Sequence, residues 1–236
     1  MIEAAPDDDA RLMELVQRRV AGEPLQYITG LAGFRHLELQ IGPGALVPRP
    51  ETESLAGRAI EVLPPNGTVI DIGTGAGPIA LSIAHERPDA RVVGTDISEE
   101  ALEWARKNRD RLGLAVELIV CDLFEGVANR LRRNVDVIVS NPPYVSEAER
   151  SALPTEVVDH EPGVALFSPR DGLEVFERIA VSAKGWLRSG GVLLSEIGDR
   201  QADVVHRVLA HLGYSSPTIR PDLVGRPRIA EATWRP

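Results

Sequence analysis

A run of four residues, Asn141-Pro142-Pro143-Tyr144, carries the groups needed to hold a planar amino group. The side-chain oxygen of Asn141 and the carbonyl of Pro142 can accept both N–H bonds of an amide or of an exocyclic base amine. The prolines lock φ and so fix the direction of that carbonyl, and the ring of Tyr144 can stack on the flat group. Such a nitrogen is a poor nucleophile because its lone pair is delocalised. We therefore predict that Asn141, Pro142 and Tyr144 catalyse transfer to it by orientation, without an assigned general base.

The place of this run in the chain favours a binding role. Residues 135–139 read Val-Asp-Val-Ile-Val, a short β-branched segment without helical period, which predicts a buried strand. Two prolines cannot continue a strand, because neither has a backbone N–H to donate. Residues 141–144 should therefore form a stiff loop at the carboxyl end of a strand, which is the edge where open α/β sheets bind ligands.

A glycine-rich turn at residues 73–77 forms a second candidate site. It follows a predicted strand and opens a predicted helix, so backbone N–H groups can approach a ligand closely. Asp96 ends the next predicted strand about 20 residues later, where an acid can bind a ribose diol. A dinucleotide turn needs a small residue at position 78, but Pro78 stands there. Proline suits the first turn of a helix and not the close approach of a diphosphate.

A ligand with a ribose and no diphosphate fits this pattern, and S-adenosylmethionine meets that description. Its amino-acid end can lie over the glycine turn and its ribose against Asp96. Its adenine can lie at the end of the third predicted strand, where Asp122 can accept a bond from the adenine amino group and Leu123 can pack on the ring. Taken singly, either acid is explained as well by a strand-end turn. Their shared position at one sheet edge favours binding.

The composition argues against several classes of function. The 236 residues are 43% hydrophobic, enough for one sizeable core, and their net charge of −9 argues against broad contact with nucleic-acid phosphates. A single cysteine, Cys121, allows no internal disulfide, and no Cys/His cluster has metal-ligand spacing, so we predict no metal. No apolar run reaches membrane-span length, and the acidic N-terminus lacks a signal-peptide pattern. We expect a cytoplasmic protein that binds neither membrane nor nucleic acid directly.

The elements that must position these residues alternate regularly from residue 68 onward. The predicted strands are 68–72, 91–95, 116–121, 135–140, 191–197 and 227–233, and the predicted helices are 78–87, 98–112, 123–132, 172–188 and 200–212. This alternation predicts a mainly parallel, doubly wound sheet, with residues 214–233 forming two antiparallel strands at its edge. The predicted helix caps are Ser98 and Asp199 at N-termini, and Gly113 and Gly213 past C-termini.

The N-terminal part is less regular. Residues 8–21 have apolar residues at helical spacing and stop at Gly22 and Pro24. Residues 34–48 alternate and turn at Gly42-Pro43-Gly44, which predicts a hairpin, and a helix restarts within 48–63. We predict a docking region of helix and hairpin at 1–50 and a cofactor-binding domain at 51–236.

Eight segments of the sequence resemble the HemK/PrmC family of protein-(glutamine-N5) methyltransferases. They are EPLQYITG, GFRHLELQIGPGALVPRPETE, DIGTGAG, GTDIS, SNPPYV, DHEPGVALF, DGLEVFERI and SGGVLLSEIG, within residues 23 to about 233. Asn-Pro-Pro-Tyr alone is not specific, because DNA adenine and RNA methyltransferases of related fold also use it. LVPRPETE is more telling, since in this family it lies beside the loop that carries the substrate glutamine.

The resemblance implies a Rossmann-like class I S-adenosylmethionine-dependent methyltransferase fold, with a seven-stranded sheet and an antiparallel edge hairpin. It implies methylation of the glutamine in the Gly-Gly-Gln motif of class 1 peptide chain release factors, the expected partner. Its motifs place the glutamine against residues 141–144 and against Arg49, Pro50, Glu51 and Thr52. The cofactor contacts that we predict in total are Asp71, Gly73, Thr74, Gly75, Ala76, Gly77, Asp96, Ile97, Asp122, Leu123 and Asn141.

Two departures from the family leave alternatives open. Only about 30 residues precede the predicted hairpin, whereas the family usually has a longer N-terminal helical domain, and Leu123 stands where the family often has an aromatic residue. A paralogue acting on another amide or amine, including a small molecule, remains an alternative, as does an N6-adenine methyltransferase. A binding protein without turnover is a third, which Asn141 and Tyr144 argue against, since a pure binder needs no clamp for an acceptor.

Overall fold

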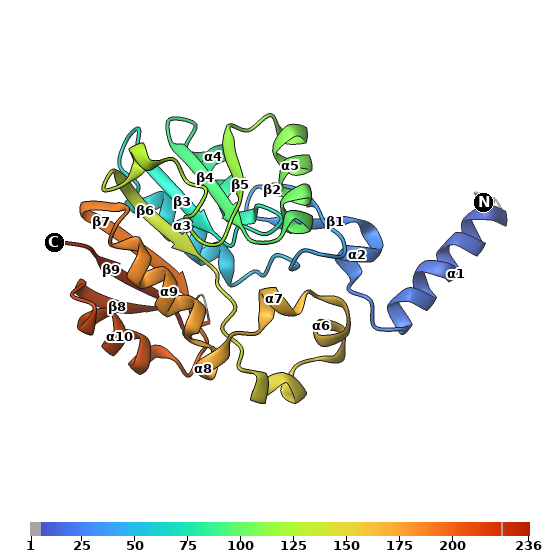
Figure 1. Cartoon of the computed structure of the whole chain (residues 1–236). Helices are drawn as coiled ribbons and strands as arrows, with labels where there is room; N and C mark the ends of the chain where they lie inside the picture. The colour runs from blue at the N-terminus through green and yellow to red at the C-terminus, as the bar shows by residue number, and fades with distance from the viewer. Residues whose placement is uncertain (1–5, 223) are drawn as a thin grey trace.

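The chain folds around a seven-stranded mixed sheet that helices cover on both faces (Figure 1). The computed structural model describes residues 6–222 and 224–236. The strand order is β5-β4-β3-β6-β7-β9-β8, and the last two strands run antiparallel to their neighbours as predicted. The strands are β3 (Thr68–Ile72), β4 (Arg91–Asp96), β5 (Val116–Val120), β6 (Val135–Ser140), β7 (Leu187–Glu196), β8 (Ser215–Pro221) and β9 (Pro227–Thr233).

Alternating residues of the central strands build two separate cores. Ile70 and Ile138 face a layer that contains α9 (Glu174–Ala183) and α10 (Ala202–His211). Val69 and Val137 face the opposite layer, which contains α3 (Thr52–Val62) and α4 (Pro78–Glu86). Because side chains on a strand alternate in direction, a continuous apolar run fills both layers, as a parallel sheet buried on two faces requires.

The pairing of β3 with β6 creates the edge at which the candidate motifs meet. The two strands run parallel with Val69 opposite Val137 and Ile72 opposite Ser140. The hydroxyl of buried Ser140 donates to the carbonyl of Ile72 over 2.7 Å and joins the strands at their carboxyl ends. The glycine turn and the Asn141 loop therefore leave neighbouring parallel strands on the same side, at the edge where open α/β sheets bind ligands.

The N-terminal hairpin exists, but the predicted position of its turn is wrong. Its strands are β1 (Leu31–Phe34) and β2 (Leu37–Gln40), and Phe34 pairs with Leu37 across Arg35 and His36. Arg35 has a φ of 50°, an unusual value for a side chain of this size. Two groups of contacts hold it there, since its backbone N–H donates to Glu53 and its guanidinium to Glu86.

The residues predicted to form the turn, Gly42 to Gly44, instead run across helix α5 (Glu99–Leu112). A Cβ on Gly42 would lie 2.6 Å from the Trp104 ring, and one on Gly44 would lie 2.2 Å from the carboxyl carbon of Glu100. These glycines therefore allow close contact between the chain and a helix rather than a reversal of direction.

Helix α1 (Pro6–Val20) confirms the predicted N-terminal helix, and a short helix α2 (Leu25–Thr29) follows it. Figure 1 shows α1 extending away from the sheet and its covering helices. Much of its apolar surface is exposed, including Val20 at 83%. An ion pair of 2.7 Å between Arg19 and Glu156 links it to α6 (Thr155–His160).

Other differences from prediction lie at element ends and in one long connection. The segment near 123–132 is only a single 3₁₀ turn, Asn129–Leu131, and the predicted helix 172–188 ends at Ala183 so that Trp186 can enter the core. Between β6 and α9 the chain forms short elements that the sequence patterns did not predict. They are η2 (Glu147–Ala152), α6, α7 (Gly163–Leu166) and α8 (Pro169–Gly172).

The predicted helix caps are confirmed at three of four positions. The Ser98 hydroxyl accepts from the N–H of Ala101, and Gly113 and Gly213 adopt left-handed φ after their helices. Asp199 is not an N-cap, because α10 starts at Ala202 and the carboxylate of Asp199 binds Arg228. In the described parts of the chain, no helix is long and apolar enough to cross a membrane.

Asn108 of α5 offers a test of how the hairpin is held. Its fully buried amide accepts from the N–H of Gln40 over 2.7 Å and donates to the carbonyls of Gln40 and Ala76. Asn108→Ala should lower the free energy of unfolding in urea by about 2–4 kcal/mol, because it leaves buried backbone groups unpaired. Exposed Glu103 on the same helix gives the control Glu103→Ala, expected within about 0.5 kcal/mol. Equal stability of both variants would contradict this account.

Candidate active site

A cavity opens at the carboxyl ends of β3, β4, β5 and β6, where the sequence motifs converge. The segment from Gly44 to Leu46 and part of α7 close its other side. Of the residues predicted to bind cofactor or acceptor, those lining it are Gly73, Gly75, Asp96, Ile97, Asp122, Leu123, Asn141, Pro142 and Pro143. Segments far apart in the sequence therefore share one cavity.

The glycine turn is shaped by hydrogen bonds to the neighbouring strand. The N–H groups of Gly73 and Thr74 both donate to the carbonyl of Thr95, and the N–H of Gly75 donates to the Asp96 carboxylate over 2.8 Å. Gly73 and Gly75 have φ values of 71° and 59°, which glycine adopts without steric cost. A Cβ on either would meet no protein atom within 4 Å, so the turn leaves open space beside it.

The other predicted residues of the turn lie away from the cavity lining. Thr74 and Ala76 are buried, and the Thr74 hydroxyl donates to Asp71 over 2.7 Å. The same oxygen of Asp71 accepts from the N–H of Ala80 at the start of α4, while its other oxygen is buried without a partner among the described residues. Gly77 caps α4 with a φ of 90°. These residues, predicted to contact a cofactor, hold the shape of the turn.

Asp96 and Asp122 differ in their surroundings. Both oxygens of Asp96 accept backbone N–H groups, from Gly75 and from Ser98 over 2.9 Å, and burial raises the pKa of its carboxyl. Asp122 forms an ion pair of 2.5 Å with Arg178 of α9. Leu123 follows with a φ of 52°, and its carbonyl accepts from the Thr95 hydroxyl. Asp96 therefore keeps the glycine turn in place, and Arg178 already holds one oxygen of Asp122.

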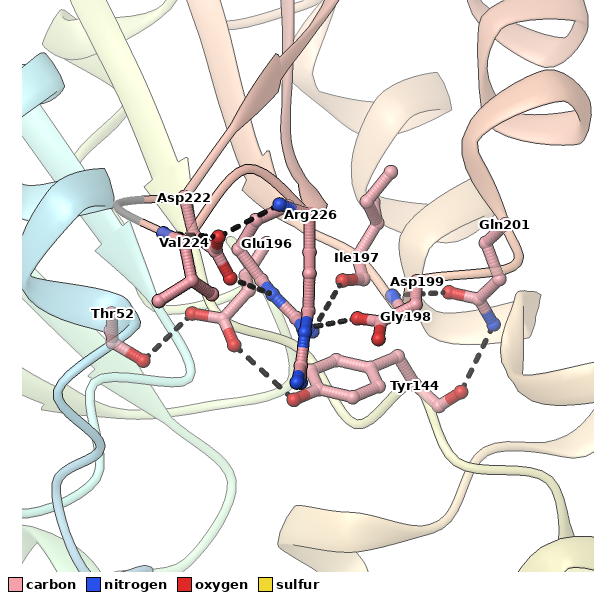
Figure 2. A network of polar contacts seen from close by, with 11 residues as sticks. Thr52, Tyr144, Glu196, Ile197, Gly198, Asp199, Gln201, Asp222, Val224 and Arg226 are labelled. Carbon is pink, nitrogen blue, oxygen red and sulfur yellow. Dashed lines mark hydrogen bonds and ion pairs between the residues drawn. The ribbon is translucent and has the colours of Figure 1, made fainter.

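The Asn141 loop is linked to a buried carboxylate that the sequence analysis did not single out. The amide of Asn141 donates to the hydroxyl of Thr52 over 3.2 Å, and that hydroxyl donates to Glu196 over 2.7 Å. The hydroxyl of Tyr144 donates to the other oxygen of Glu196 over 3.2 Å, as Figure 2 shows. Glu196 is the last residue of β7, in the segment SGGVLLSEIG, and an acid ending an apolar run was the available signal.

Comparison with known proteins identifies the family. Residues 2–30 match the PrmC N-terminal domain family, and residues 55–161 match the Methyltransferase small domain family. The chain is 44% identical over 233 residues to the release factor glutamine methyltransferase of Streptomyces coelicolor, covering 96% of this chain and 81% of that protein. It is 40% identical over 229 residues to the protein of the same name from Koribacter versatilis, with coverages of 96% and 80%.

The chain belongs to the release factor glutamine methyltransferase family. The resemblance read from the sequence motifs is thereby confirmed. A solved methyltransferase from Pyrococcus furiosus has a TM-score of 0.62 to this chain at 21% identity, covering 97% of this chain and 98% of that one. At that identity the likeness concerns the fold, and it agrees with the predicted Rossmann-like methyltransferase architecture.

In this methyltransferase the segment predicted to lie beside the substrate is fixed by a second buried acid. Glu161 accepts from the N–H of Val47 over 3.1 Å and pairs with Arg49 over 2.5 Å. The Glu161 side chain is 1% exposed, so breaking this pair would leave a buried charge uncompensated. Arg49 therefore ties the Val47–Arg49 segment to the loop before α7. Glu51 is exposed and Thr52 is buried.

The backbone of Tyr144 is held as closely as its side chain. The amide of Gln201 donates to the carbonyls of Tyr144 and Asp171 over 3.0 and 3.1 Å. Gly172, with a φ of 79°, lies so close to the backbone of Tyr144 that a Cβ on Gly172 would be 2.0 Å from the Tyr144 carbonyl oxygen. Sequence patterns did not indicate either contact, since both join residues far apart in the chain.

The buried Asp71 of this methyltransferase should make stability depend on pH. Burial raises the pKa of Asp71 to about 7. Because this value exceeds that of an unfolded aspartate, its stabilising contribution is present in full below about pH 4 and is lost as the pH rises through about 7. Asp71→Asn cannot ionise and should not show this loss. The difference in free energy of unfolding between Asp71→Asn and wild type should therefore shift in favour of the variant by a few kcal/mol as the pH rises from about 4 to about 7, at about 1.4 kcal/mol per pKa unit.

Urea unfolding of both proteins at several pH values measures this difference. Asp159→Asn serves as control because Asp159 is exposed, and it should follow the wild-type pH dependence. A constant difference between Asp71→Asn and wild type across the range would show that Asp71 does not titrate in it.

Proposed function

We propose that this chain transfers a methyl group from S-adenosylmethionine to the side-chain amide nitrogen (N5) of a glutamine, in the Gly-Gly-Gln motif of a class 1 peptide chain release factor. One observation carries the proposal: Asn141 and Pro142 line the same cavity as the glycine turn and Asp96. The residues proposed to hold the methyl acceptor and those proposed to hold the cofactor therefore line one cavity. Membership in the release factor glutamine methyltransferase family supports the choice of acceptor.

The residues around the glycine turn fit the proposed cofactor. Gly73 and Gly75 line the cavity without a Cβ, which leaves room for a ligand beside their backbone. Asp96, Asp122 and Leu123 follow at the ends of the next two strands, in the order needed for a ribose and an adenine. S-adenosylmethionine, when bound, supplies a methyl group activated by attachment to a positively charged sulfur. Asp96 holds the ribose hydroxyls, and Leu123 packs against the base.

The acceptor side works by orientation. The side-chain oxygen of Asn141 and the carbonyl of Pro142 accept the two N–H bonds of the glutamine amide, and Tyr144 packs beside it. On transfer the bond between the methyl carbon and the sulfur would break and leave a neutral thioether, and the methylated amide would release one of its two protons to water. Pro142 and Pro143 limit the freedom of the loop, so little rearrangement is needed when the amide arrives.

The entrance suits a narrow, extended peptide. Gly44 to Leu46 line the cavity on the side away from the strand ends, next to Pro162, Val164 and Ala165. A glutamine preceded by two glycines can reach past these residues, since glycine adds no side chain that would clash. Asparagine should react poorly, because its amide lies one methylene short of the position that Asn141 and Pro142 define.

Asp96→Ala tests the cofactor half of the proposal. Loss of a charged acceptor for the ribose hydroxyls should weaken S-adenosylmethionine binding by about 1.5–3 kcal/mol, measured by calorimetry. Because Asp96 also accepts from Gly75 and Ser98, thermal melting must show that the variant is folded. An unchanged dissociation constant in a folded variant would make Asp96 only a turn residue.

Asn141→Ala tests the acceptor half. The variant should lose most methyl transfer, about 100-fold or more, because the amide is no longer aligned. Its affinity for S-adenosylmethionine should change much less. The measurement is mass spectrometry of a release factor incubated with enzyme and cofactor, reading the Gly-Gly-Gln peptide.

The same assay separates the alternatives. With labelled cofactor and a cell extract, label in nucleic acid or in a small molecule, with none in the release factor, would move the assignment to another acceptor and leave the cofactor site intact. Near-wild-type turnover of Asn141→Ala would instead contradict the proposal that Asn141 aligns the acceptor amide.

A further inference from the structure

Glu196 is a buried carboxylate whose partners are unusual. It is 1% exposed at the end of β7, yet among residues 6–222 and 224–236 it takes part in no ion pair. The nearby guanidinium of Arg228 instead binds Asp199 and Asp222 and donates to the Ile197 carbonyl. The Glu196 oxygens accept from hydroxyl groups, those of Thr52 and Tyr144. Burying a carboxylate in this way is costly for stability, which points to a role in the site.

The direction of these hydrogen bonds is set by chemistry. Burial raises the pKa of the Glu196 carboxyl, and once this carboxyl is ionised its oxygens can only accept. In that state the Thr52 hydroxyl donates its single proton to Glu196. The Thr52 oxygen can then only accept from Asn141, and the group that donates to it is the NH₂ of the amide. The oxygen of the Asn141 amide is consequently the end that remains for an acceptor group in the cavity.

We propose that Glu196, acting through Thr52, is a positioning residue that fixes which end of the Asn141 amide faces the methyl acceptor. The other oxygen of Glu196 accepts from the Tyr144 hydroxyl. One buried carboxylate therefore orients the Asn141 amide, through Thr52, and the Tyr144 ring directly, on either side of Pro142 and Pro143. This inference rests on the proposed function, because it assigns the acceptor as a group that donates N–H bonds.

The arrangement also bears on specificity. A primary amide donates two N–H bonds and suits the oxygen that Asn141 presents. A carboxylate donates none and would be repelled by that oxygen, so glutamate in place of glutamine should not bind productively. If Thr52 were free to reverse its bonds, Asn141 could present either end and this discrimination would weaken.

The test uses variants of the network in the whole chain. Thr52→Val removes the relay, Glu196→Leu removes the acceptor at similar volume, and Thr52→Ser keeps the hydroxyl. Thr52→Val and Glu196→Leu should each lower kcat for release-factor methylation by about 10–100-fold. The KM for the release factor and the dissociation constant of S-adenosylmethionine should each change by less than about threefold, a split typical of lost alignment. Thr52→Ser should stay within about threefold of wild type.

Two further comparisons exclude a merely structural effect. The double variant Thr52→Val/Glu196→Leu should have a kcat little lower than that of Glu196→Leu alone. Both changes break the same chain of hydrogen bonds from Glu196 through Thr52 to Asn141, so their effects should not add. Thr218→Val, an exposed threonine in β8, should behave as wild type. If Glu196→Leu does not fold, Glu196→Gln replaces it. The two hydroxyls bind different oxygens of Glu196, and the NH₂ group that replaces one of these oxygens can only donate, so this variant should lose at least about fivefold in kcat.

A readout without substrate separates this inference from the proposed function. The side-chain NH₂ resonance of Asn141, assigned by its loss in Asn141→Ala, should move in Thr52→Val and Glu196→Leu and stay close to wild type in Thr52→Ser. An unmoved resonance in both variants, or kcat within about twofold of wild type, overturns the positioning role. Failure of the wild type to methylate any release factor, with the resonance moving as expected, counts against the proposed substrate alone.

Discussion

The parallel pairing of β3 with β6 is the contact on which the site depends. It brings the residues after Ile72 and after Ser140 to one edge, although 68 positions separate the bonded pair in sequence. A shift of β6 by one residue against β3 would turn Ile138 from one core to the other and exchange the apolar residues that β6 gives to the two layers. The two cores therefore fix the register, and the register places the glycine turn beside the Asn141 loop.

Buried carboxylates organise the loops that surround this edge. Asp71 and Asp96 hold the glycine turn, Glu161 holds the segment from Val47 to Arg49, and Glu196 holds Thr52 and Tyr144. Most of their donors are backbone N–H groups or hydroxyls on short or rigid side chains, which lie close to the main chain. Loops that carry few apolar contacts of their own thus acquire defined shapes, as a site that works by orientation requires.

The sequence predicted the parts of the structure that depend on local patterns. β3, β6 and β9 match their predicted ranges. In β3 and β6 this is because short runs rich in β-branched apolar residues, without helical period, leave few alternatives. The hairpin turn at Arg35 was missed, since that conformation is held by Glu53 and Glu86, which lie elsewhere in the chain. Likewise α9 ends before its apolar pattern does, because Trp186 is needed in the core.

The two halves of the site differ in the same way, and this has a consequence for specificity. The proposed cofactor half is built from strand ends and a contiguous turn, so short motifs were enough to predict it. The acceptor half depends on contacts across the fold: Thr52 and Glu196 are 144 positions apart, and Arg49 and Glu161 are 112 apart. A substitution far from residues 141–144 can therefore change how an acceptor is held without altering the motif itself. Conversely, Asn-Pro-Pro-Tyr occurs with several acceptors because the motif supplies only the groups that bind an amino nitrogen. The surrounding acids and hydroxyls determine how those groups are presented, and in the arrangement that we propose they leave the oxygen of Asn141 for the acceptor.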